Sequence, residues 1–419
     1  MGNGIDDRAV DAQRTERLDW RFKAIPATAH GMTAEEYLGG RPPLDEFGTP
    51  LLTLDASALD HNVRLMADWT ERAGVRLAPH GKTTMAPALW RRQLDAGAWG
   101  VTLANLPQLR VARAFGVRRL LLANALVDPA GLAWIGGQLD TDPDFTFISW
   151  VDSVRTAELM DEALRAARVQ RAVHVCVELG GPHGRTGARD EETALAVAEA
   201  VRKAPSLRLA GLGGYEGALA HDATDEGRAA VDAYLRRLAD LHGRLPYETD
   251  EPIVTAGGSS YFDQVAEVLS GLDGCEVVLR SGAYIVHDDG FYRQISPFAR
   301  GADGERFRSA MHGWGRVVSR PEPALALLDT GKRDLPFDEG MPEPQLVCGA
   351  GPKAVSGARV TAMNDQHTFL EGGEVAVGDI VRLGLSHPCT AIDKWTLIPV
   401  VDDADAERPV VVDLIRTWF

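Results

Sequence analysis

The chain has 419 residues, of which 45% are hydrophobic and 25% are charged, a composition typical of globular proteins with sizeable buried cores. Its formal net charge is −16 and no segment is rich in lysine or arginine, which argues against nucleic acid or an anionic membrane as a partner. The N-terminus lacks the apolar core of a signal peptide, and no run approaches the roughly 18 apolar residues of a membrane span, so we expect a cytoplasmic protein with a small-molecule substrate.

Residues 1–45 form a polar N-terminal extension to which no motif assigns a role. From residue 46 to residue 290, short β-rich runs alternate with Ala-, Leu- and Arg-rich stretches of the kind that form helices. Eight or nine such units predict an α/β fold with a (β/α)8 TIM-like barrel, because a doubly wound sheet usually has fewer strands. The β-rich runs lie at 51–55, 75–80, 100–105, 119–126, 145–152, 172–180, 207–215, 252–259 and 275–284.

Residues 291–419 follow a different pattern. Stretches such as ARVTAMNDQHTFLE and EVAVGDIVRLGL alternate apolar and polar residues at period two, and Gly/Asp turns separate them. No convincing helix lies between these stretches. The pattern therefore predicts a C-terminal β-domain after the barrel.

Lys82 lies where barrel enzymes carry their chemistry. Active sites of such barrels form at the C-terminal ends of the strands, and Lys82, in HGKTTMAP, directly follows the run at 75–80. A lysine at that place can be partly desolvated, which lowers its pKa and makes its amine available for a Schiff base. The alternative is a solvated surface lysine.

Polar and glycine-rich loops follow later runs. ELGGPHGRTG supplies His183 and Arg185, and GGYEGALAH supplies Tyr215 and His221. TAGGSS and LRSGAY are rich in glycine, and backbone N–H groups in such loops can hold a phosphate group. Each loop alone is weak evidence, since glycine-rich turns are common in barrels. Together with Lys82 they indicate a phosphorylated aldehyde, pyridoxal 5′-phosphate, as the cofactor.

Near the C-terminus, SHPCT places His387 and Cys389 two positions apart. Histidine and thiolate ligands suit zinc, and two protein ligands leave positions open for water and substrate oxygens, as a catalytic site requires. The alternative is an ordinary β-strand histidine beside a buried thiol. Cys176 and Cys275 lie in or beside strand-like runs and are expected to be small core residues, because widely spaced cysteines suggest no disulfide framework.

The chain resembles the fold-type III pyridoxal-phosphate enzymes, which have an alanine racemase-like barrel and a C-terminal β-domain, and among them the D-serine dehydratase and D-threonine aldolase group. PHGKT, GRTG, GGS and SHPCT carry the resemblance. It implies that Lys82 forms the Schiff base and acts as the base at the α-carbon. It also implies that His387 and Cys389 bind a divalent metal beside the cofactor, and that the protein is a homodimer.

The resemblance implies further roles one residue at a time. His221 matches a histidine that the aldolases use close to the substrate β-hydroxyl. Arg280 resembles the arginine that meets the pyridine nitrogen in alanine racemases, and a plain salt bridge is its alternative. His367 lies where these enzymes often carry a histidine, and a structural role is its alternative. The other implied cofactor contacts are Arg185 and Tyr215 near the ring, and Gly257, Gly258, Ser259, Gly282 and Ala283 around the phosphate.

The metal pair bears on the reaction. Proton removal by Lys82 alone could support racemisation, whereas expulsion of a β-hydroxyl group needs a Lewis acid. Within the group, cysteine at position 389 favours dehydration, with conversion of D-serine to pyruvate and ammonia as the expected reaction. D-threonine aldolase, which releases glycine and an aldehyde, is the alternative that His221 supports. A metal-free racemase of the same fold and a non-catalytic cofactor-binding barrel are further alternatives, and the metal pair argues against both.

Overall fold

The structure is a computed structural model that describes residues 4–182, 184–301, 304–348 and 353–419. It divides into two compact units whose segments alternate along the sequence. Three consecutive segments, 1–45, 46–290 and 291–419, were expected from the sequence, and these domain boundaries stay a prediction. The first unit contains the residues up to Asp6, Met66–Lys82 and Trp90–Gly282; the second contains Asp7–Leu65, Thr83–Leu89 and Ala283–Phe419.

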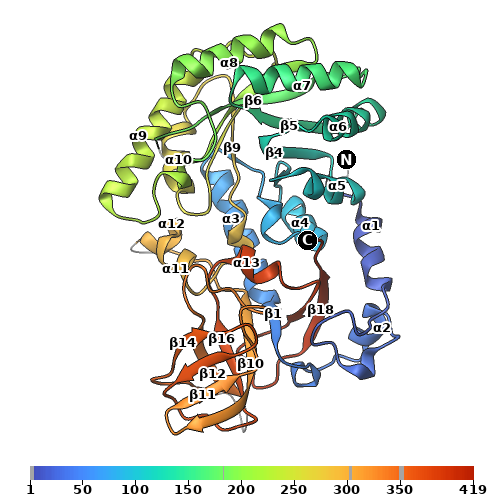
Figure 1. Ribbon diagram of the computed structural model, residues 1–419, viewed down its shortest axis with the longest axis vertical. Helices are drawn as coiled ribbons and strands as arrows, with labels where there is room; N and C mark the ends of the chain where they lie inside the picture. The colour runs from blue at the N-terminus through green and yellow to red at the C-terminus, as the bar shows by residue number, and fades with distance from the viewer. Residues whose placement is uncertain (1–3, 183, 302–303, 349–352) are drawn as a thin grey trace. The chain divides into compact units, whose positions relative to one another are not determined.

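Eight parallel strands form the first unit's sheet in the part of the chain that the structure describes (Figure 1). Their order is β2-β9-β8-β7-β6-β5-β4-β3, and a parallel bridge between His80 and Thr102 closes the sheet into a barrel. The predicted barrel is therefore confirmed. The strands are β2 (Arg76–Leu77), β3 (Val101–Leu103), β4 (Arg119–Ala125), β5 (Thr146–Val151), β6 (Val173–Leu179), β7 (Leu207–Gly214), β8 (Ile253–Ala256) and β9 (Glu276–Leu279).

Helices lie on the outer side of these strands (Figure 1). They are α5 (Leu106–Ala114), α6 (Pro129–Thr141), α7 (Val154–Ala166), α8 (Glu191–Lys203), α9 (Asp225–His242) and α10 (Phe262–Leu269). The first five begin at a polar side chain that accepts a hydrogen bond from a backbone N–H of the first turn, which satisfies a donor that the helix itself leaves unpaired. Trp150, Cys176 and Val278 are among the strand residues that form an apolar core. Cys176 is fully buried, as expected, and Cys275 is half-buried.

A mainly antiparallel sheet of ten strands, counted over the described residues, forms the second unit (Figure 1). Its main order is β13-β12-β16-β10-β1-β17-β18, and β11, β15 and β14 continue from β10 as a side branch. The predicted C-terminal β-domain is confirmed. The strands are β1 (Leu51–Asp55), β10 (Met311–Glu322), β11 (Leu325–Leu328), β12 (Glu343–Cys348), β13 (Lys353–Ala354), β14 (Arg359–Met363), β15 (Thr368–Glu371), β16 (Ile380–Gly384), β17 (Leu397–Val401) and β18 (Val411–Arg416).

Strand β1 corrects one detail of the sequence prediction. The run at 51–55 was expected to open the barrel, but it pairs antiparallel with β10 and parallel with β17. All five of its residues are buried. A short, fully buried run looks the same in either kind of sheet, so its hydrophobic pattern could not assign it.

The N-terminal extension contributes to the core of the second unit. Leu18, Phe22 and Leu44 are buried in one cluster with Trp314 and Leu414. The extension contains α1 (Asp7–Asp11) and α2 (Ala34–Gly39), and α3 (Ala56–Arg72) follows β1. The short helices α11 (Phe291–Ile295) and α12 (Pro297–Arg300) precede β10, and α13 (Pro388–Ile392) lies between β16 and β17. No helix among the described residues is long and apolar enough to cross a membrane.

Candidate active site

Lys82 lies in a short 3-10 helix, η4 (Gly81–Thr83), close behind strand β2. Its side chain is half-buried. Packing requires the glycine before it, because a Cβ atom on Gly81 would lie 2.8 Å from both Trp90 Nε1 and Val101 Cγ1. Trp90 Nε1 also donates a hydrogen bond to the Gly81 carbonyl at 3.2 Å. The core of the first unit therefore holds the turn that carries Lys82.

Three cationic side chains influence His80, two residues before Lys82. Burial holds the pKa of this imidazole well below its usual range, and the charges of Lys82, Arg280 and Arg185 lower it further. The ring is therefore neutral. His80 Nδ1 and Trp150 Nε1 are buried and have no hydrogen-bond partner in the described part of the chain. Positive charge and orphaned polar atoms at one end of the barrel fit an anionic, polar cofactor such as pyridoxal phosphate.

Arg280 is buried at the end of β9. Its guanidinium group donates to Thr255 Oγ1 at 2.7 Å and to the Gly214 carbonyl at 2.6 Å, and it lies 4.8 Å from the centre of a Trp150 ring. Both hydrogen-bond acceptors are neutral, unlike the carboxylate of a plain salt bridge. The contacts hold the guanidinium in place inside the barrel, and its role towards the cofactor stays a prediction.

Arg185 and Tyr215, both predicted near the cofactor ring, lie together. The Arg185 Cζ atom is 4.5 Å from the centre of the Tyr215 ring, which is a cation–π geometry. Gly258 packs against the same ring, because a Cβ atom there would lie 3.0 Å from Tyr215 Cε2. The structure therefore brings together three predicted site residues from the loops after β6, β7 and β8.

Glu216, which the sequence analysis did not single out, holds the glycine-rich loop after β8. It is completely buried, and its carboxylate accepts hydrogen bonds from the backbone N–H groups of Gly257 at 3.0 Å and Gly258 at 2.6 Å. Gly257 has φ of +92°, a conformation that favours glycine. Two of the amides expected to hold a phosphate thus have a carboxylate partner in this structure. Their role in phosphate binding stays a prediction.

The other residues predicted around the phosphate are placed as follows. Ser259 is half-buried in the turn before α10. Gly282 approaches the backbone of His80 so closely that a Cβ atom would lie 2.5 Å from the His80 carbonyl oxygen. Ala283 is buried and is the first residue of the second unit's last segment. Gly282 is therefore required by close packing, whatever ligand the loop binds.

The remaining predicted histidines differ in their surroundings. His221 is exposed in the loop before α9. His367 is also exposed and lies in the turn between β14 and β15, outside both strands. His183 is outside the described residues. The roles of His221 and His367 therefore stay predictions.

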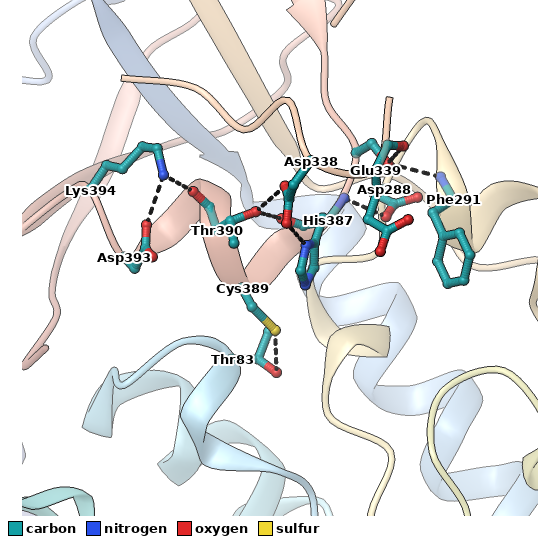
Figure 2. A network of polar contacts seen from close by, with 11 residues as sticks. Thr83, Asp288, Phe291, Asp338, Glu339, His387, Cys389, Thr390, Asp393 and Lys394 are labelled. Atoms are coloured by element: carbon teal, nitrogen blue, oxygen red, sulfur yellow. Dashed lines mark hydrogen bonds and ion pairs between the residues drawn. The ribbon is translucent and has the colours of Figure 1, made fainter. Parts of the chain in front are cut away.

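His387 and Cys389 lie at the start of α13 in the second unit, where a β-strand pair had been the alternative. His387 has φ of +57°, and Cys389 lies in the first turn of the helix. The Cys389 thiol is 3.5 Å from the hydroxyl of Thr83, the residue after Lys82 in the sequence (Figure 2). A side-chain hydrogen bond with Cys389 raises the pKa of His387 to about 9, against the opposing effect of burial.

Two aspartates hold His387, and the sequence analysis identified neither. Asp338 Oδ2 lies 2.5 Å from His387 Nδ1, and Asp288 Oδ2 accepts a hydrogen bond from the His387 backbone N–H at 3.0 Å (Figure 2). Asp288 is buried, which raises its pKa to about 6. The sequence held no signal for either residue, because each lies far from His387 along the chain.

The donor atoms fit an open metal site. Among the described residues, no group of three or more His, Cys, Asp or Glu side chains could hold a metal ion. His387 and Cys389 would therefore supply two ligands, which is too few for a closed structural zinc site and leaves positions for water and substrate. A nitrogen and a thiolate are ligands that zinc accepts readily.

Two family models match the chain: one described as "Alanine racemase, N-terminal domain" over residues 54–270 and one described as "Putative serine dehydratase domain" over residues 310–401. The chain is 30% identical to D-threonine aldolase from an Arthrobacter species, over 87% of this chain and 92% of that protein. The crystal structure of D-threonine aldolase from Filomicrobium marinum has a TM-score of 0.75 and 28% identity, covering 90% of this chain and 96% of its own.

D-threo-3-hydroxyaspartate dehydratase from Delftia sp. HT23 is also similar, with a TM-score of 0.71 and 22% identity over 88% of this chain and 97% of its own. Two mutants of a D-threo-3-hydroxyaspartate dehydratase are similar as well. One changes a histidine to alanine, and the other, in the metal-free form, changes a cysteine two positions further on.

Proposed function

We propose that this chain, which belongs to the fold-type III pyridoxal-phosphate enzymes of the D-serine dehydratase and D-threonine aldolase family, is a dehydratase of β-hydroxy D-amino acids. The proposed reaction converts D-serine to pyruvate and ammonia: water leaves the substrate, and a second water later releases the ammonia. The coarser class, a pyridoxal-phosphate lyase related to enzymes of β-hydroxy D-amino acids, follows from the relatives.

The pair of His387 and Cys389 carries the choice of dehydration. Their spacing matches the histidine and cysteine changed in the dehydratase mutants. Aldol cleavage is the second candidate, and the 30% identity to D-threonine aldolase over most of the chain favours it. Both reactions act on a β-hydroxyl group, so only the products separate them.

Each residue of the candidate site has its own role in the proposed reaction. Pyridoxal phosphate, when bound, makes the α-carbon acidic, and a bound zinc ion stabilises negative charge on a departing β-oxygen. Lys82 would hold the cofactor and take the α-proton as a general base. His387 and Cys389 would hold the metal. The positive charges of Arg185 and Arg280 would favour the anionic cofactor.

Product analysis tests the proposal. Purified enzyme is incubated with D-serine, D-threonine and 3-hydroxy-D-aspartate, and keto acid plus ammonia is measured against glycine plus aldehyde. Keto acid supports dehydration, whereas glycine supports the aldolase candidate. A Lys82→Ala variant serves as the control, because it should lose either activity and the absorbance of the bound cofactor.

A separate metal measurement tests the ligands. The Cys389→Ala variant should lose bound zinc and retain the cofactor, since Cys389 lies in the second unit and Lys82 in the first. Retention of zinc at the level of the unmodified protein would contradict the proposed pair. The homodimer and the cytoplasmic location also remain proposals, which sedimentation and cell fractionation would test.

A further inference from the structure

Asp338 makes two contacts in the α13 region, and each uses a different carboxylate oxygen. Oδ2 is paired with His387 Nδ1 at 2.5 Å, and Oδ1 accepts a hydrogen bond from Thr390 Oγ1 at 2.8 Å (Figure 2). Thr390 belongs to the same short helix as Cys389. One carboxylate thus ties the ring of the proposed metal ligand to the helix that carries its partner ligand.

The backbone of His387 is held by a second carboxylate. Asp288 Oδ2 accepts the His387 N–H, while Asp288 Oδ1 accepts N–H groups of Gly290 at 3.1 Å and Tyr292 at 2.8 Å. The left-handed backbone of His387 therefore has a fixed support at its amide. Asp288 already holds the main chain of His387, but the imidazole ring could still rotate about its side-chain bonds. The contact from Asp338 restricts that rotation.

The ring contact also selects one nitrogen for a metal. When a metal binds one nitrogen of an imidazole, the ring keeps its proton on the other nitrogen, and here the carboxylate of Asp338 faces Nδ1. The lone pair then lies on Nε2. Carboxylates that bind the second nitrogen of a metal-ligating histidine fix its tautomer and make it a better ligand.

We infer that Asp338 is a positioning residue that holds His387 with Nε2 presented to a divalent metal. The inference rests on the proposed metal pair. Asp338 would not bind that metal itself, because Nδ1 and Nε2 point away from each other across the imidazole ring. Because Asp338 fixes the orientation of the His387 ring, two protein ligands can form a defined metal site without a third.

Zinc affinity tests the inference in the full chain loaded with pyridoxal phosphate. A chromophoric chelator competes for zinc, and the apparent dissociation constant is compared among the unmodified protein and the variants Asp338→Ala, Asp338→Asn and His387→Ala. We expect Asp338→Ala to bind zinc about 10 to 100-fold more weakly, the usual effect of losing such a contact. The zinc affinity of Asp338→Asn should lie between those of the unmodified protein and Asp338→Ala, since an amide oxygen can still accept a hydrogen bond from Nδ1 but carries no charge. His387→Ala should lose zinc.

The control is Asp393→Asn, which removes a carboxylate paired with Lys394 immediately after α13 and should leave zinc affinity unchanged. Nitrogen-15 NMR of labelled histidine gives a second readout, because Asp338→Ala should weaken the preference for the proton on Nδ1. Zinc affinity of Asp338→Ala within about twofold of the unmodified protein, with zinc lost in His387→Ala, would overturn the inference alone. Unchanged zinc binding in His387→Ala would instead overturn the metal pair, and the inference with it.

Discussion

Replacement of Glu216 by glutamine should destabilise the barrel far more than its small chemical change suggests. The carboxylate of Glu216 is completely buried and accepts two backbone N–H groups, from Gly257 and Gly258. In Glu216→Gln the remaining side-chain oxygen still accepts a hydrogen bond from one backbone amide. The new NH2 group faces the other backbone amide, so two buried hydrogen-bond donors face each other and neither has an acceptor. A hydrogen bond to a charged group contributes about 1.5–3 kcal/mol, and an unsatisfied buried donor costs about 1–3 kcal/mol. We therefore expect a loss of about 2–4 kcal/mol.

Equilibrium unfolding in urea measures this loss as a change in the free energy of unfolding. The matched control is Glu199→Gln, on the same unit, because Glu199 pairs with Arg202 and Lys203 on an exposed helix surface. An exposed ion pair contributes about 1 kcal/mol or less. If Glu216→Gln lies within about 0.5 kcal/mol of this control, the carboxylate does not support the glycine loop and the reasoning is refuted.

Three other substitutions test further parts of the structure. Burial raises the pKa of Glu178 from an ordinary 4.5 to about 7, so the folded state binds this proton more tightly than the unfolded chain does. The free energy of unfolding should therefore fall by up to about 3 kcal/mol as the pH rises from 4.5 to 7. Calorimetry measures this pH dependence, and the contribution of Glu178 should be missing in Glu178→Gln. Gly81→Ala should lower the melting temperature, since its Cβ atom would press on Trp90, whereas Gly137→Ala, with open space around it, should not. Asp55→Ala should cost about 2–4 kcal/mol in urea unfolding, because this buried carboxylate accepts hydrogen bonds from Ser57, Ala58 and Ala404.

Much of the fold could be predicted because alternation of strand and helix is a local property of the sequence. The eight runs from 75–80 to 275–284 contain the eight barrel strands of the described chain. The run at 51–55 was assigned to the wrong sheet, because its partners β10 and β17 lie more than 250 positions away in the sequence. The short helix α13 was missed because Pro388 and Cys389 give no helical periodicity over five residues.

The candidate site shows the same division between local and distant information. Lys82, Arg185 and Tyr215 could be proposed because they lie in the loops after β2, β6 and β7, and the C-terminal ends of barrel strands are known places for chemistry. His80 escaped notice although it lies in the same motif as Lys82. Its significance comes from burial and from the charges around it, and neither can be read from neighbours in the sequence.

The residues that hold other residues in place were the hardest to find, and the reason is physical. The chain has 60 acidic residues, and a negative net charge suggests carboxylates on a solvated surface. Glu216 instead holds the amide of Gly258, 42 positions away in the sequence. Asp288 and Asp338 hold His387, which lies 99 and 49 positions from them. A carboxylate becomes a strong structural acceptor only when folding removes water and brings amide or imidazole N–H groups to it. Motifs in the sequence can therefore suggest which residues take part in the chemistry, whereas the carboxylates that hold other groups in place become visible only in the folded chain.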